Sequence, residues 1–146
     1  MPIAPPVAGL VFALEVDGVQ MATFHTCSGL GSTTEVIEHK TVDATGKEAI
    51  RMVPGRLKWS NLVLERGVDR SAKLWNWRQQ VIDGKLDAAR RNGAVVAMAP
   101  EGGPILRWEF VAGWPCGWSA SSTGDANGMA VERLEIVHEG LRLRAL

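Results

Sequence analysis

Hydrophobic and polar residues alternate at the start of the chain in the pattern of antiparallel strands. Between residues 10 and 16, apolar side chains occupy every second position, and Asp17-Gly18 then supplies a typical hairpin turn before VQMATFHTC. A third segment, TTEVIEHKTV, carries charges around its apolar pair, as expected where one face of a strand meets solvent. This part of the chain therefore predicts three strands.

The periodic pattern stops after the third predicted strand. The residues from Asp43 to about Pro54, DATGKEAIRMVP, are polar, contain glycine and show no regular period. A loop of that length is uncommon in a compact domain unless it has a function, so we expect a functional loop here. The alternative, a surface excursion without a role, stays open.

The segment KLWNWRQQVIDGK predicts one short helix. Asp69 and Ser71 are suitable N-cap residues, and Gly84 stands where a left-handed C-terminal residue belongs. Trp75 and Trp77 lie roughly 160° apart on the margins of one apolar arc. An arc that wide covers either a curved sheet of its own chain or a second surface.

Four further runs of strand character complete the pattern. RLKWSNLVLERG precedes the helix, and GAVVAMA, PILRWEFVAGW and MAVERLEIVHEGLRL follow it, separated by PEGGP and SASSTGDANG. We therefore expect one domain, residues 1–146, that is mainly β. Its six or seven strands are best closed into an antiparallel β-barrel or a small sandwich, in either case with two packed sheets. One helix flanks the strands, and a long loop follows the third strand.

Composition narrows the function classes. The 146 residues suffice for one domain with a core, and 16 basic and 16 acidic residues leave no charged face for nucleic acid. The two cysteines, Cys27 and Cys116, have neither disulfide-framework nor zinc-like spacing. The sequence shows no export signal and no membrane span, so we expect a soluble protein without a membrane anchor.

Candidate chemistry is sparse. The one catalytic combination worth testing joins Cys27 or Cys116 to His25, His39 or His138, and no nucleophile elbow surrounds either thiol. No phosphate-binding or metalloprotease motif occurs, so we predict no catalytic residue, no cofactor and no metal. A small-ligand barrel is the other alternative, although bulky side chains predicted to point inward favour a filled interior.

Several fragments carry a family resemblance. FALEVDG, SGLGSTTEVIEHK, VPGRLKWSNLVLERG, LWNWRQQVIDGK, RWEFVAGWP and VERLEIVHEGL occur in this order, from Phe12 to about Leu141. Together they resemble the tail-tube protein family of contractile phages and of phage-derived contractile injection systems. The start, MPIAPPVAG, and the residues Cys116 and Trp118 depart from the family pattern and leave open which tube paralogue this is.

The resemblance implies a structural protein rather than an enzyme. Tail-tube proteins are β-barrels flanked by one helix, whose hexameric rings stack into a hollow tube inside a contractile sheath. The implied partners are further copies of the chain, a sheath protein, baseplate or spike proteins, and cargo or DNA in the lumen. The implied location is a phage tail or injection particle assembled in the cytoplasm. A tube-like adaptor at the baseplate end stays as the alternative.

The resemblance also implies an interface. In such tubes the segment after the third strand reaches the neighbouring subunit or ring, and here that segment falls on residues 43–56. Trp77 matches the usual helix tryptophan of the family and is assigned to its own core, whereas Trp75 is assigned to the neighbouring subunit. Whether Glu35 and Glu38 or the opposite faces line the lumen stays open. The predicted interface residues are Asp43, Thr45, Lys47, Glu48, Arg51, Met52 and Trp75.

Overall fold

The computed structural model describes residue 5, residues 8–122 and residues 130–145, so most of MPIAPPVAG and part of SASSTGDANG lie outside the described residues. The fold is mainly β, as predicted, with a second, very short helix beside the expected one. Its elements are β1 (Val11–Val16), β2 (Val19–Phe24), β3 (Thr26–Ser28), β4 (Ser32–Val42), β5 (Glu48–Trp59), β6 (Leu62–Gly67), α1 (Lys73–Ile82), α2 (Leu86–Ala89), β7 (Arg91–Met98), β8 (Pro104–Ser121), β9 (Val131–Val137) and β10 (Gly140–Ala145).

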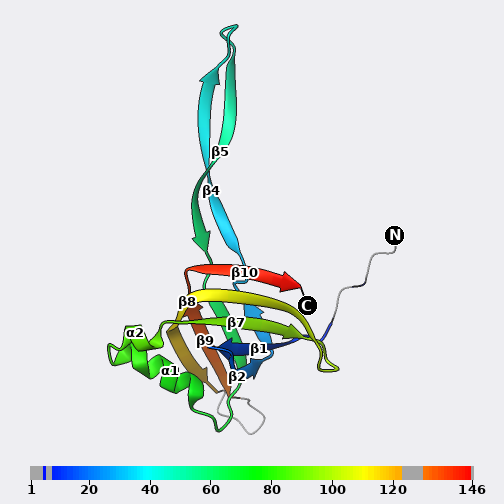
Figure 1. Cartoon of the computed structure of the whole chain (residues 1–146), viewed down its shortest axis with the longest axis vertical. Helices are drawn as coiled ribbons and strands as arrows, with labels where there is room; N and C mark the ends of the chain where they lie inside the picture. Colours follow the sequence, from blue (N-terminus) through cyan, green and yellow to red (C-terminus); the bar gives the residue numbers. More distant parts are fainter. Residues whose placement is uncertain (1–4, 6–7, 123–129, 146) are drawn as a thin grey trace.

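The body of the molecule is one eight-stranded antiparallel sheet folded over on itself (Figure 1). Its order is β2-β1-β7-β8-β9-β6-β3, and β10 also pairs with β8. The long strand β8 bends near Ala112, whose φ is +51°. The part of β8 before the bend pairs with β7 and β10, and the part after it pairs with β9.

Two packed layers therefore enclose one core, which confirms the prediction of two packed sheets. The described strands pair in one open order that ends at β2 and at β3, so the hydrogen bonds do not close these layers into a barrel. The interior is filled by side chains from both layers and from the helices. The largest fully buried ones include Phe24, Phe110, Leu14, Leu62, Leu64, Leu74, Leu134 and Ile136.

Helix α1 covers the sheet near β8 and is confirmed over Lys73–Ile82. Gly84 has the predicted left-handed conformation, with φ +79°. The predicted N-cap is wrong: the cap position is Ala72, and no side chain caps the helix. Trp77 is buried, as assigned, and its Nε1 donates a hydrogen bond to the carbonyl oxygen of Ala89 in α2 at 2.7 Å. No helix in the described part of the chain is long and apolar enough to cross a membrane.

The ring of Phe110 lies between two glycines. A Cβ atom at Gly93 would lie 2.5 Å from its Cζ, and a Cβ atom at Gly113 would lie 2.4 Å from its Cε1. These contacts are closer than real Cβ atoms permit, so glycine is required at both positions for the ring to fill this part of the core.

The largest departure from the sequence-based prediction is the region after the third strand. Instead of a long loop, β4 and β5 form a hairpin that projects far beyond the body (Figure 1). We call residues 32–59 the arm. The true turn spans only residues 43–47. Both faces of the arm are exposed, so burial does not impose the alternation by which a strand is recognised, and residues 48–54 resemble a loop.

The root of the arm is held by close backbone contacts. Gly29 has φ +84°, and a Cβ atom there would lie 1.8 Å from the carbonyl oxygen of Asn61. The amide of Ser60 donates to the carbonyl oxygen of Gly31 at 3.2 Å. Because the two chain segments touch backbone to backbone, only glycine fits at position 29.

Candidate assembly interface

The arm exposes large aliphatic side chains on one face. Paired residues of an antiparallel hairpin point to the same side, and Glu38 pairs with Met52, Lys40 with Ile50 and Val42 with Glu48. We call the side that these residues share with Val36 the aliphatic face. Its members Val36, Val42, Ile50 and Met52 are between 58% and 66% exposed.

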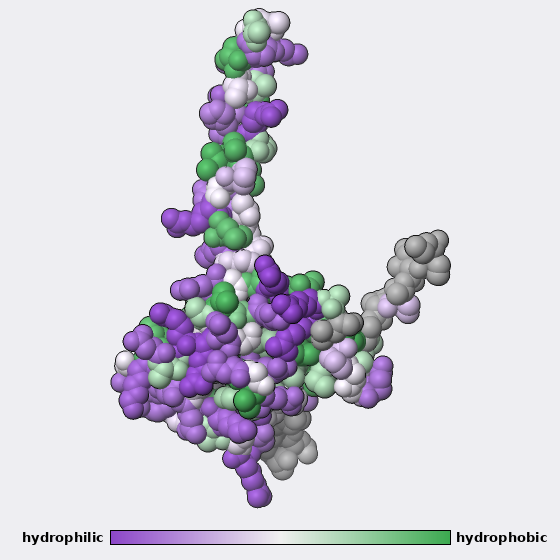
Figure 2. All heavy atoms as spheres, in the orientation of Figure 1, coloured by the Kyte–Doolittle hydropathy of each residue, from purple (hydrophilic) through white to green (hydrophobic). Residues whose placement is uncertain are grey.

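The opposite side of the arm has a different character. It holds the pairs Ile37 with Val53, His39 with Arg51 and Thr41 with Ala49. We call this side the basic face, because Arg51 is the one formal charge among these six residues. Figure 2 shows green aliphatic groups alternating with purple polar ones along the arm, outside the body. Several large aliphatic side chains exposed together on one projecting element are suited to an interaction site.

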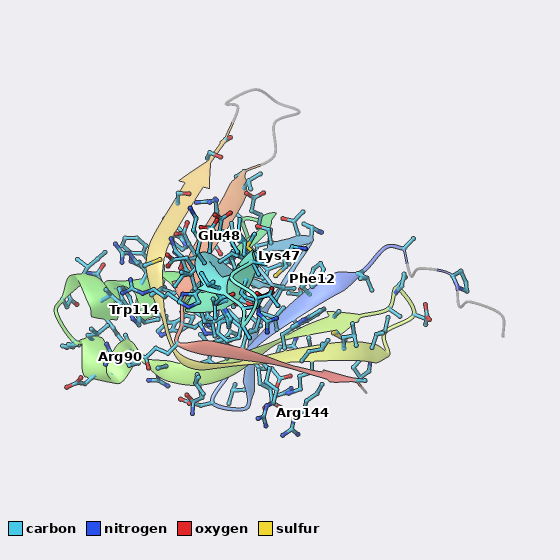
Figure 3. All side chains as sticks on the ribbon, turned by 90° about the horizontal axis from the view of Figure 1, so that it is seen from above. Phe12, Lys47, Glu48, Arg90, Trp114 and Arg144 are labelled. Carbon is cyan, nitrogen blue, oxygen red and sulfur yellow. The ribbon has the colours of Figure 1, made fainter. Side chains whose placement is uncertain are left out.

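The tip of the arm is ordered by one carboxylate. Asp43 accepts hydrogen bonds from the hydroxyl of Thr45 at 2.6 Å and from the amides of Thr45 and Lys47, each at 2.9 Å. The side-chain bond from Thr45, followed by the amide of Lys47, lowers the pKa of Asp43. Figure 3, viewed from above, shows Lys47 and Glu48 over the middle of the body. The polar tip is thus a preformed turn.

The structure brings together six of the seven predicted interface residues. Asp43, Thr45 and Lys47 lie in the turn at the tip, which joins β4 to β5. Glu48 and Met52 lie on the aliphatic face and Arg51 on the basic face. Trp75 lies apart from them, in α1.

Sequence reasoning missed the residues that dominate the aliphatic face. Val36, Val42 and Ile50 were not among the predicted interface residues. The available signal was the occurrence of β-branched and long apolar side chains within a polar segment, which favours strand structure over a loop.

Free strand edges add to this surface. Among the described strands, β4 and β5 pair only with each other, β2 pairs only with β1, and β10 pairs only with β8. Each of these strands therefore presents a row of unpaired backbone groups, which a strand of another chain can satisfy.

The residues considered for catalysis are not arranged for it. Burial raises the pKa of the Cys27 thiol to about 12. Burial, and then the neighbouring carboxylate of Glu135, raise the pKa of Cys116. Within residues 8–122 and 130–145, no hydrogen bond joins either thiol to a histidine, and no group of three acidic, cysteine or histidine side chains is placed to hold a metal. Both thiols are held in their unreactive protonated form.

Comparison with known proteins places these features in a family. The family model described as "T4-like virus tail tube protein gp19" matches residues 9–142. No curated protein sequence matches the chain.

Solved structures show the same fold at low identity. A chain of the PVC sheath-tube complex of an extracellular contractile injection system has a TM-score of 0.76 and 19% identity, over 97% of this chain and 93% of that one. A chain of the anti-feeding prophage tube-terminating cap has a TM-score of 0.74 and 17% identity, over 100% and 95%. Hcp1 from Salmonella typhimurium has a TM-score of 0.56 and 14% identity, over 94% and 87%.

Proposed function

The chain belongs to the T4-like virus tail tube protein family and is therefore a structural subunit of an inner tube, and we propose that its arm joins copies into stacked hexameric rings. The observation that carries this proposal is the aliphatic face of the arm, which no described part of the same chain covers. An apolar surface that projects away from its own core is suited to burial against another copy.

Symmetry explains how repetition of such a contact can build a tube. A head-to-tail contact closes into a ring when the rotation between copies divides the circle, and the same kind of contact along the axis builds a filament. The free edges of β2 and β10 can be covered in the ring, which removes an aggregation hazard of the isolated subunit. The lumen of the stacked rings is the conduit for cargo or DNA.

The energetics favour apolar contacts over surface charges. Fully burying one aliphatic side chain stabilises a contact by about 1.5–3 kcal/mol, and the aliphatic face offers four such side chains. An exposed salt bridge contributes only about 0–1 kcal/mol. An interface built on the arm therefore suits a wall that must stay intact when a sheath contracts around it.

We extend the same proposal to further partners. Two similar structures are described as a sheath-tube complex and as a tube-terminating cap, which supports a sheath protein and end-binding proteins as neighbours of this subunit. We place the assembly of this subunit in the cytoplasm, before the particle is released. No enzymatic activity is proposed.

Shortening the arm tests the proposal. Residues 39–51 are replaced by Asn-Gly, so that the paired residues Glu38 and Met52 flank a two-residue turn. We expect a body that melts at the wild-type temperature but forms no tubes, because the deletion removes intersubunit surface without touching the core. Thermal unfolding, sedimentation and negative-stain electron microscopy measure the outcome.

Each alternative has its own result in this experiment. Long tubes from the shortened variant would contradict the role of the arm. A wild-type protein that stays monomeric at high concentration would refute ring assembly and favour the small-ligand barrel. Wild-type single rings that never stack would favour the adaptor at the baseplate end.

A further inference from the structure

A groove separates α1 from the edge of the sheet. It has a volume of about 390 Å³, and its apolar part is formed by Val16, Val19, Met21 and Trp77. Val19 is 60% exposed although it lines the same groove as the buried Trp77, so no described part of the same chain covers this apolar patch.

The rim of the groove is polar and carries the ammonium group of Lys73. Asn76 and Gln80 lie along the helix side, and Arg91 forms an ion pair with Asp17 at 2.9 Å. Among the described side chains, none forms an ion pair with Lys73. A partner with apolar side chains and a carboxylate would complement both the floor and the rim.

A free strand edge runs beside the groove. Val19 and Met21 belong to β2, the end strand of the sheet, which pairs only with β1. An extended segment seated in the groove can therefore form backbone hydrogen bonds with β2 while its alternate side chains enter the apolar patch.

We propose that this groove receives the aliphatic face of the arm of a second copy. The inference rests on the proposed function, because it names the surface that the arm binds. Along the aliphatic face, Glu38 and Glu48 lie on either side of Lys40, next to Met52 and Ile50. The face therefore presents apolar groups and one net negative charge.

The charge of the groove selects this face over the other. The basic face would bring Arg51 toward Lys73, and like charges brought together disfavour binding. The aliphatic face carries one net negative charge from Glu38, Lys40 and Glu48. The groove carries one net positive charge from Asp17, Lys73 and Arg91, which this face complements.

The arm of the same chain cannot occupy the groove. The arm rises from the body and points away from α1, which lies low against the sheet (Figure 1). Strand β4 has 11 residues and spans about 35 Å at roughly 3.3 Å per residue. The arm thus extends toward a neighbouring copy and leaves its own groove open.

Blocking the groove is the first test. Val19→Arg places a charged side chain in the apolar patch, and Val111→Arg is the matched control, because Val111 is also exposed, at 48%, but lies outside the groove. We expect Val19→Arg to raise the concentration needed for assembly about ten-fold or more, with an unchanged melting temperature of the monomer, and the control to assemble like wild type. Normal assembly of Val19→Arg, or equal loss in both variants, would overturn the inference.

Charge reversal is the second test, and it identifies the two contacting surfaces. Lys73→Glu should weaken assembly, and so should a Lys substitution at Glu38 or Glu48. Combining Lys73→Glu with the Lys substitution at the contacting glutamate should restore it, because the pair is rebuilt with the signs exchanged. If neither combination restores assembly, the arm does not bind this groove.

The two proposals fail in different ways. If arm shortening abolishes tubes while Val19→Arg and the charge reversals leave them intact, the arm joins the copies at another surface, and the proposed function stands. If the shortened arm still gives tubes, the proposed function and this inference fall together.

Discussion

The indole of Trp75 packs edge-on against the indole of Trp118, with ring centroids 4.8 Å apart and ring planes at 69°. Trp75 therefore has a partner in its own chain, yet it stays 38% exposed. Trp77, two residues on, is 4% exposed and hydrogen-bonded to α2. The two tryptophans on the margins of the helix thus have different surroundings, and the assignment of Trp75 to a neighbouring subunit stays a prediction.

Replacing each of these tryptophans should have a different effect. Trp77→Ala removes a core side chain and should lower the free energy of unfolding by about 3–5 kcal/mol. Trp75→Ala should cost the monomer only the edge-on contact, about 0.5–1.5 kcal/mol, while weakening assembly by about 2 kcal/mol or more if it is an interface hot spot. Thermal unfolding of the monomer and sedimentation over a concentration series separate the two. Equal effects on both measurements would contradict the assignment.

A smaller side chain at position 110 should rescue an alanine substitution at one of the two neighbouring glycines but not at the other. Gly113→Ala and Gly93→Ala should each destabilise the fold by about 1–3 kcal/mol through overpacking. Adding Phe110→Leu should recover part of the loss at Gly113, where only side chains obstruct a Cβ atom. It should not do so at Gly93, where the carbonyl oxygen of Glu15 also lies 2.4 Å away. Urea unfolding measures all variants, with Gly103→Ala as the control in open space.

The buried ion pair of Arg66 and Glu132 should be costly to break from one side. Arg66 Nε lies 2.9 Å from Glu132 Oε1, and the side chains are 8% and 6% exposed. Glu132→Ala should lower the free energy of unfolding by about 3–5 kcal/mol, because it leaves the guanidinium buried with one fewer partner. The double variant Arg66→Met with Glu132→Leu should be much less destabilised. A double variant as unstable as the single one would show that packing, not charge, sets the cost.

Protonation of His138 at low pH should lower the free energy of unfolding. Burial lowers the pKa of its imidazole, and the ring accepts a hydrogen bond from the Gly140 amide at Nδ1 while Nε2 lies 3.1 Å from the carbonyl oxygen of Ser60. The folded protein thus favours the neutral ring. Its stabilising effect is complete above the unfolded pKa of about 6.5 and is lost as the pH falls toward the lower folded pKa.

Urea midpoints at several pH values test this linkage. The wild-type midpoint should decrease between about pH 7 and pH 5, and His138→Gln should show a smaller decrease over the same range. The difference between the two proteins isolates the contribution of this histidine from that of the carboxylates. If the midpoints of the two proteins decreased equally with pH, His138 would make no contribution to the pH dependence of stability.

Local sequence features predicted much of the body. The period of the apolar residues located α1, and the alternation around Trp108 and Phe110 placed them on one side of β8 and Arg107 and Glu109 on the other. These features are readable because burial on one face imposes a period.

The prediction failed where burial does not act within one chain. Residues 48–54 were expected in a loop, although they form the first part of β5. Their side chains are exposed, so burial within the described chain leaves no period in this stretch of the sequence. The sequence could not predict the proposed contact between the arm and the groove beside Val19, because that contact joins elements far apart in the sequence and involves a second copy.

Gly29, at the root of the arm, helps to fix the direction in which the arm projects from the body. The arm extends about 35 Å, so a rotation of about 5° at its root would displace the tip by about 3 Å, close to the width of one residue along a strand. The backbone contact between Gly29 and Asn61 leaves no room for any larger residue, which would have to push the two chain segments apart. In a filament joined through the arm, an angular error at this point would be repeated by every subunit and would accumulate along the length. The straightness of such a filament would then depend on the hydrogen atom that glycine carries in place of a methyl group at position 29.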